Sequence, residues 1–429
     1  MFSGGVGLDR VTNLWRAGFF VLLCALAAGA QTHDQVAPTL SSAHHGFTVF
    51  APRGHTDAPG NSEFEFPASS QIDSIPTFNG EFRAAGVGPM GAPQHQWLYT
   101  IAGGRPDLGG TTAFNAPIVP VSIDLLDYDG SVRVVNGHRL HDSVAPFIKP
   151  TLNSPVFQAA EYSSSDSPTQ FSDSVGRAEF YNTMQSDWHT MLRPAVKTPR
   201  TLSIPRGAYY FALNHDGSCC AFVLIDIDVF SDRLFPPSAA DTSTPIGAAE
   251  HSADVTTRDI STFLFPNTYL YLKHNPNNCC VLGFHTYDYE PGDRANGFRE
   301  KRFVLNFSSW ISPGLFGSGF EDVTALSHEV TESVNDPFVG SDGVHGITPW
   351  WLSENGNCQD DFEVGDVVEG LPDSTTAIKM NGRTYHPQNM ALLQWFAFQS
   401  PSTALGGAYS YPNQSVLTSL SPPQAVNCK

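Results

Sequence analysis

The sequence has little positive charge. Its 429 residues include 23 Lys and Arg against 42 Asp and Glu, which gives a formal net charge of −19 at pH 7. Nucleic acids and anionic membrane surfaces bind basic patches through their own negative charge. A chain this acidic is therefore not expected to bind nucleic acid or an anionic membrane surface.

Long hydrophobic runs are also missing, apart from one near the N-terminus. There Arg10 and Arg16 precede an apolar run at residues 17–28, and small residues lead up to Ala30. A basic start, a short apolar run and small residues before a cleavage point are the three zones of a secretory signal. The run is shorter than the roughly 20 residues that span a bilayer. We expect residues 1–30 to be a signal peptide, and the mature protein to be secreted or periplasmic and not held in a membrane.

Cysteine is scarce, with seven in the chain, and one of these lies inside the predicted signal peptide. An even number in an exported chain favours disulfides. Each adjacent pair follows a turn-like segment and precedes a β-rich run, so we expect the pairs to cross-link neighbouring strands. Zinc held by four thiolates is the competing interpretation, which the spacing disfavours because such sites usually separate their cysteines by two to four residues. The six remaining cysteines are Cys219, Cys220, Cys279, Cys280, Cys358 and Cys428.

A Gly-x-Ser-x-Gly motif is absent, so the sequence gives no support for hydrolysis by a serine on a nucleophile elbow. Strand-like runs, rich in β-branched and aromatic residues and bounded by turn residues, dominate from Gln96 onward. Apolar residues at helical spacing predict a helix at residues 177–192 and another at 385–398, and residues 236–259 read as a long polar loop. The strand-like runs are at residues 97–102, 116–126, 131–135, 208–213, 221–230, 280–289 and 302–307.

These elements predict an α+β fold, with a β-rich N-terminal lobe followed by a metal-binding helix and a C-terminal helical segment. We expect a flexible leader at residues 31–75, a β-rich lobe at 76–300 and a metal-helix and C-terminal lobe at 301–429. The length also allows residues 76–429 to form one domain. His285 lies on the predicted strand at residues 280–289, where a histidine satisfied within the sheet is expected rather than a ligand.

The most informative stretch runs from Ser318 to Pro337. Ser318 and Glu321 have the spacing of a capping box, and Pro337 cannot continue a helix, so one amphipathic helix is predicted between them. Apolar side chains fall on one face and polar ones on the other. The apolar face carries Phe320, Val323, Leu326, Val330 and Val334, and the other face carries Glu321, Ala325, His328 and Glu332.

His328 and Glu332 are one helical turn apart, so their side chains can reach one cation together. Glu329 lies next to His328, and the pattern follows the H-E-x-x-H zinc helix with its second histidine replaced by Glu332. The intervening glutamate of such a helix takes a proton from the metal-bound water. An exposed polar helix face is the alternative interpretation.

A third ligand is expected in the acidic segment that follows the helix. Glu363, in Glu363-Val-Gly-Asp366, is the best candidate, and Glu354 is the second. Asp366 or Asp336 can orient the ligands through hydrogen bonds. A solvated acidic turn, or calcium held by several oxygens, is the alternative.

Four local patterns occur in an order that resembles a family of exported, largely uncharacterised bacterial proteins. That family has an H-E-x-x-E helix followed by Asp-Pro and a downstream Glu-x-Gly-Asp, and its H-E-x-x-E core is similar to that of zincin metallopeptidases. The resemblance covers roughly residues 150–429. The patterns are Gly283-Phe-His-Thr, Ser327 through Phe338, Cys358 through Asp366, and Tyr385-His-Pro-Gln-Asn-Met-Ala.

The resemblance implies zinc ligands at His328, Glu332 and Glu363 and a general base at Glu329. Zinc is the expected metal, with calcium or another divalent cation as alternatives, and a polypeptide is the expected substrate. His386 or Tyr385 is assigned to the oxyanion that forms during peptide hydrolysis. The competing hypothesis is a non-enzymatic exported protein of the cell surface that holds a structural cation.

Overall fold

The computed structural model describes residues 34–35, 72–83, 96–162, 167–317, 319–339, 351–355, 358–359, 362–418 and 420. The predicted signal peptide, most of the predicted leader, Ser318 and Cys428 lie outside the described residues, as does the side chain of Cys358. Within the described residues, no helix is both long and apolar enough to cross a membrane.

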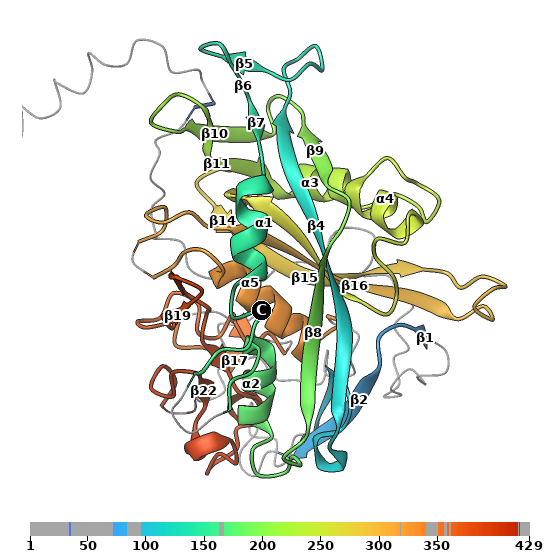
Figure 1. Ribbon diagram of the computed structural model, residues 1–429, viewed down its shortest axis with the longest axis vertical. Coiled ribbons are helices and arrows are strands. Elements are labelled where there is room, and N and C mark those ends of the chain that lie inside the picture. The colour runs from blue at the N-terminus through green and yellow to red at the C-terminus, as the bar shows by residue number, and fades with distance from the viewer. Residues whose placement is uncertain are drawn as a thin grey trace, which may run out of the picture.

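The chain mixes helices and strands around a central sheet that is mostly parallel (Figure 1). The long strand β4 pairs in parallel with β8, β9 and β12, and β12 pairs in parallel with β16. β1 also joins β16 in parallel, whereas β7 and β15 pair antiparallel. The sheet contains β1 (Ile72–Asp73), β4 (Thr111–Leu125), β7 (His141–Asp142), β8 (His189–Val196), β9 (Arg200–Ile204), β12 (Ile260–Pro266), β15 (Gly283–Glu290) and β16 (Glu300–Trp310).

The prediction of a mixed fold is thus confirmed, but an α+β chain usually has an antiparallel sheet, and here the central strands run parallel. The predicted domain boundaries stay predictions. Two facts bear on them: residues 72–73 of the predicted leader pair with β16, and β16, which begins at residue 300, shares its sheet with β4 and β12.

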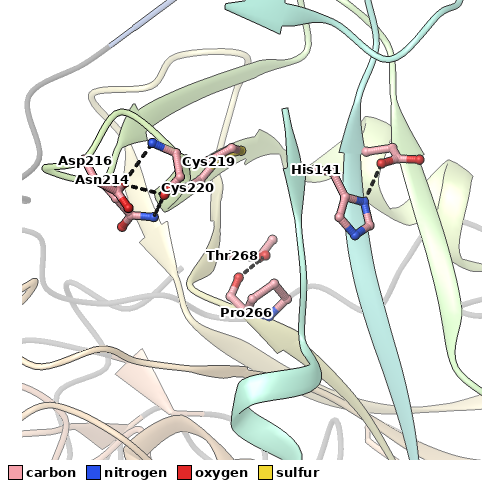
Figure 2. The surroundings of a disulfide bond; sticks show 9 residues. His141, Asn214, Asp216, Cys219, Cys220, Pro266 and Thr268 are labelled. Carbon is pink, nitrogen blue, oxygen red and sulfur yellow. Dashed lines mark hydrogen bonds and ion pairs between the residues drawn. A yellow bond between two sulfur atoms is a disulfide. The ribbon is translucent and has the colours of Figure 1, made fainter. Parts of the chain in front are cut away.

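A second sheet of four strands carries both pairs of adjacent cysteines. It has the order β10-β11-β13-β14, with β10 (Tyr209–Leu213), β11 (Cys219–Asp226), β13 (Thr268–Tyr271) and β14 (Cys279–Val281). Cys219 is bonded to Cys220, and Cys279 to Cys280. The expectation that these cysteines cross-link neighbouring strands is therefore wrong. Figure 2 shows the first disulfide at the start of β11, beside the turn that carries Asn214 and Asp216.

Two hydrophobic cores cover the two faces of the central sheet, because successive side chains of a strand point to opposite faces. On β16, Val304 packs into the core that contains α5 (Thr324–Asn335). Phe303 and Leu305 pack into the core that contains α3 (Ile227–Leu234) and α4 (Pro245–His251). On β12, Leu264 joins the first core and Phe263 the second. The strands are thus buried on both faces, as in other parallel sheets.

Six α-helices lie within the described residues: α1 (Ala145–Leu152), α2 (Phe171–Glu179), α3 (Ile227–Leu234), α4 (Pro245–His251), α5 (Thr324–Asn335) and α6 (Leu393–Phe396). The predicted helix at residues 177–192 is wrong, because α2 ends at Glu179 and residues 189–196 form β8. Eight backbone pairings with β4 hold this strand, and they outweigh its helical spacing of apolar residues.

The predicted C-terminal helix is also mostly wrong. Only Leu393–Phe396 is helical, and Arg383–Tyr385 and Met390–Ala391 form short strands paired with residues elsewhere in the chain. The predicted polar loop at 236–259 contains α4. The remaining strands are β2 (Thr77–Arg83), β3 (Gln96–Ala102), β5 (Val134–Val135), β6 (His138–Arg139), β17 (Trp351–Leu352), β18 (Cys358–Gln359), β19 (Ile378–Met380), β20 (Arg383–Tyr385), β21 (Met390–Ala391) and β22 (Ser410–Tyr411).

Helix α5 confirms the prediction of a helix that ends before Pro337, but it begins at Thr324 instead of Ser318. The start is late because the backbone groups of Ile311 and Asp322 bond to each other and hold the preceding residues out of a helix. All twelve helix residues are buried, on the polar face as well as the apolar one. The alternative of a solvent-exposed polar face is therefore wrong.

Candidate metal centre

Three segments that lie far apart in the sequence bring histidines and carboxylates together around α5. The helix itself supplies His328, Glu329 and Glu332, β15 supplies His285, and residues 362–369 supply further carboxylates. Helix α5 lies between the central sheet and the C-terminal segment (Figure 1). The site is therefore enclosed by the sheet on one side and by the segment after the helix on the other.

One group of ligand atoms forms on the polar face of α5. His328 Nε2 lies 3.0 Å from Glu332 Oε2 and 3.3 Å from Asp366 Oδ1. The three side chains are at least nine-tenths buried. His328 and Glu332 thus reach one point from positions one turn apart, as the sequence predicts, and the third acid at that point is Asp366.

A second group forms around His285. Its Nδ1 lies 3.3 Å from Glu332 Oε2, 3.5 Å from Glu363 Oε2 and 3.9 Å from Glu329 Oε2. Glu363, the expected third ligand, is grouped with His285 and Asp336 rather than with His328. Glu332 belongs to both groups, because its Oε2 contacts both imidazoles.

The outer nitrogen of each imidazole is committed to a carbonyl oxygen. Nε2 of Gln388 donates to the Gly365 carbonyl at 2.7 Å, which leaves Gln388 Oε1 to accept from His328 Nδ1 at 3.2 Å. His285 Nε2 donates in the same way to the Asp336 carbonyl at 3.0 Å. Metal-binding histidines are held by hydrogen bonds of this kind, which fix the tautomer and turn the inner nitrogen toward the metal.

These distances fit the requirements of a small divalent cation. Ligand atoms that are about 2.0–2.2 Å from one tetrahedral zinc ion lie roughly 3.3 Å from one another. His328 Nε2 lies 3.0 and 3.3 Å from the two carboxylate oxygens of its group, and His285 Nδ1 lies 3.3 and 3.5 Å from its two nearest carboxylate oxygens. Imidazole nitrogen with carboxylate oxygen is a donor set that zinc accepts.

The electrostatics of the site favour added positive charge. Burial raises the pKa of Glu329 well above its usual range, and burial also raises the pKa of Asp366. Burial lowers the pKa of His328, but the Glu332 and Glu329 carboxylates outweigh that effect and hold it well above its usual range. The site therefore has an excess of negative charge, which a bound cation would compensate.

The contacts of residue 365 explain why a glycine stands between Glu363 and Asp366. Its N–H donates to Glu332 Oε1 at 2.8 Å, and its carbonyl accepts from Gln388. A Cβ at this position would lie 2.7 Å from Cγ and 2.8 Å from Cδ2 of the His328 ring, closer than real contacts allow. The glycine therefore lets the backbone lie flat against the imidazole while holding Glu332.

Replacing Gly365 by Ala is expected to weaken metal binding by roughly 10–100-fold, because the new methyl group displaces the His328 ring from its hydrogen bond with Gln388. Zinc affinity measured by competition with a chromophoric chelator tests this. Gly104→Ala is the matched control, since its Cβ meets only Thr112 Oγ1 at 3.3 Å. Equal zinc affinities for the two variants would show that Gly365 does not position the ring.

Two residues predicted for the oxyanion have other partners. The Tyr385 hydroxyl donates to the Pro150 carbonyl at 2.9 Å. The His386 ring contacts the segment just before α5, where its Nδ1 is 2.8 Å from Asp322 Oδ2 and 3.4 Å from Glu321 Oε1. His386 is thus grouped with Glu321 and Asp322 and not with His328. Glu354, the second candidate ligand, is exposed.

A small pocket opens beside the first group. His328, Glu329 and Asp366 line its polar side with Glu369, and its apolar side includes Cys280 of the second disulfide. The pocket has a volume of about 20 Å³, which is enough for one water molecule or ion. Glu329 therefore faces a space where a water molecule fits next to His328.

Sequence reasoning missed the part played by three residues. It assigned His285 to the sheet alone, Asp366 to orienting other ligands, and Gln388 to no role. The signal for His285 was its place in Gly283-Phe-His-Thr: a Cβ on Gly283 would lie 2.5 Å from Glu329 Oε1, so β15 runs directly against the site. Gln388 had no local signal, because its contact with His328 spans 60 residues.

The resemblance drawn from the motifs remains an expectation, and the assignment of zinc, peptide hydrolysis and export remains with it. No protein-family model, curated protein or solved structure matches this chain.

Proposed function

We propose that the protein is an exported zinc-dependent hydrolase of polypeptides, with His328, Glu332 and Asp366 as ligands and Glu329 as general base. The observation that carries the proposal is the convergence of His328 Nε2 with Glu332 and Asp366, while Gln388 holds the outer nitrogen of the ring. Asp366 takes the place that was predicted for Glu363.

Glu329 is the residue best placed to move protons. It lies next to His328 on α5 and lines the same water-sized pocket. Burial raises its pKa, so its carboxylate takes up a proton more readily than an exposed glutamate does. Glu329 can therefore accept a proton from a water molecule in the pocket and deliver it to a leaving amine.

Zinc, when bound, supplies a Lewis acid that lowers the pKa of its water toward about 7 and polarises a carbonyl group. The charges of the ligands that the chain supplies determine how strongly the ion lowers the pKa of its water. One neutral imidazole and two carboxylates leave a divalent cation formally neutral, and this acidifies water less than two imidazoles and one carboxylate. We therefore expect hydrolysis to be slower than with a two-histidine site.

A structural cation site in a non-enzymatic exported protein is the second candidate. The burial of the site favours it, because His328 and Glu332 are 7% and 1% exposed and the pocket holds only one water-sized molecule. A structural site fills all its coordination positions with protein atoms, whereas a catalytic one keeps a position open.

Metal analysis of the purified mature chain, combined with hydrolysis of an unfolded polypeptide, tests the proposal. We expect zinc to co-purify, and a chelator to abolish hydrolysis that added zinc restores. Calcium in place of zinc, with no hydrolysis under any metal, would favour the structural site and contradict the proposed function.

A further inference from the structure

The inner nitrogen of His285 faces carboxylate oxygens that cannot donate a hydrogen bond to it when they are ionised. His285 is 4% exposed, and its Nε2 proton is used by the Asp336 carbonyl. In the neutral ring, Nδ1 therefore carries a lone pair. The nearest carboxylate oxygens to Nδ1 belong to Glu332, Glu363 and Glu329, at 3.3, 3.5 and 3.9 Å.

Such a cluster of acceptors needs a positive charge at its centre. Buried polar groups without compensation cost free energy, and buried like charges repel each other in a medium of low dielectric constant. Two species can supply the charge: a proton on His285, or a metal ion bound by Nδ1 and the carboxylates. A proton gives one charge, and three carboxylates surround it.

This cluster is separate from the one around His328. Among the described residues, His285, Asp336 and Glu363 form one group whose ligand atoms all lie within 4.8 Å of one another, and His328, Glu332 and Asp366 form another. Glu332 Oε2 lies between the two imidazoles, 3.0 Å from one and 3.3 Å from the other. No group among the described residues contains both histidines, so each histidine can bind its own ion.

We propose that the protein holds a second divalent cation, bound by His285, Asp336 and Glu363. The proposal rests on the proposed function for the first ion at His328. The single imidazole and the carboxylates of this second site suit zinc or manganese.

The chain provides the surroundings for this second ion. Glu363 is 14% exposed, the most open of the side chains around His285, so an ion can enter from its side. The Asp336 carbonyl orients the imidazole, and the Asp336 carboxylate belongs to the same group as His285 and Glu363. Asp336 directly follows α5, so the end of the helix fixes its position.

Metal content measured by mass spectrometry tests the proposal on the mature chain. The protein is equilibrated with zinc, or with manganese in a parallel experiment, and then freed of unbound metal. We expect two ions per chain in the parent and one in His285→Ala. His141→Ala is the matched control, because His141 is a half-exposed histidine paired with Asp124 outside the site, and it should keep two ions.

Glu363→Gln serves as a second variant in case His285→Ala fails to fold, and it should also lower the content from two ions to one. One ion per chain in the parent would show that a proton on His285 balances the carboxylates, and would overturn the proposal. Two ions in both site variants would overturn it as well. Two ions in a parent without hydrolytic activity would contradict the proposed function while leaving the second ion in place.

Discussion

Replacing Glu329 by Gln is expected to lower hydrolysis by about 10²–10⁴-fold while the chain keeps its bound metal. The amide has nearly the shape of the carboxylate, so packing against Gly283 and His328 is preserved, but it cannot accept a proton. Glu329 lies 3.9 Å from His285 and is not one of the three proposed ligands at His328, so we expect metal binding at His328 not to depend on its charge. Turnover of an unfolded polypeptide and metal content, measured on the same preparation, check both parts.

Glu354→Gln is the control for this change, because Glu354 is an exposed acid outside the groups around His285 and His328. It should retain both activity and metal. If Glu329→Gln keeps full activity, Glu329 is not the base. If Glu329→Gln loses both metal and activity, Glu329 acts as a ligand and the assignment of roles on α5 must change.

The stability of the protein is expected to fall as the pH rises from about 5 to 8, and Glu179 should account for a large part of the loss. Glu179 is buried at the end of α2, where its Oε1 accepts from Leu393 N–H and from the Asn335 side chain at the end of α5. Burial raises its pKa to about 8, against the lowering effect of these hydrogen bonds.

The sign follows from the raised pKa. Below about pH 4.5, Glu179 is protonated in both the folded and the unfolded chain, so its contribution to stability is fully present. Between that pH and about 8, the unfolded chain releases the proton and the folded chain retains it, so each step in pH favours unfolding. The full loss is of the order of 3–5 kcal/mol, since one unit of pKa corresponds to about 1.4 kcal/mol.

Glu179→Gln isolates this effect, because the amide oxygen accepts the same two hydrogen bonds and the side chain stays neutral at every pH. Urea unfolding of the parent and the variant at several pH values should give a difference in free energy of unfolding that moves in favour of the variant as the pH rises. Glu161→Gln, at an exposed position, should follow the parent. A constant difference between parent and Glu179→Gln across this range would contradict the raised pKa.

Helix α5 shows how much of the site can be predicted from local sequence. Pro337 ends the helix wherever the rest of the chain lies, and the spacing of His328 and Glu332 puts their side chains on one face of any helix. Both results were predictable, as were the strands β3, β10, β15 and β16. The start of α5 was not, because a backbone pairing between Ile311 and Asp322, eleven residues apart, outweighs the capping signal of the preceding segment.

The sequence by itself determined the donor types, the helix that carries three of them, the acidic segment that follows it and the strand that carries His285. Only the tertiary structure decided which donors meet: Asp366 contacts His328, Glu363 contacts His285, and Gln388 orients a ring 60 residues away. Glu363 and Asp366 are three residues apart and equally able to bind a cation, so no local preference separates them. The contacts of Gly365 with His328 and Glu332 fix the path of the backbone between them, and that path sends one carboxylate to each histidine.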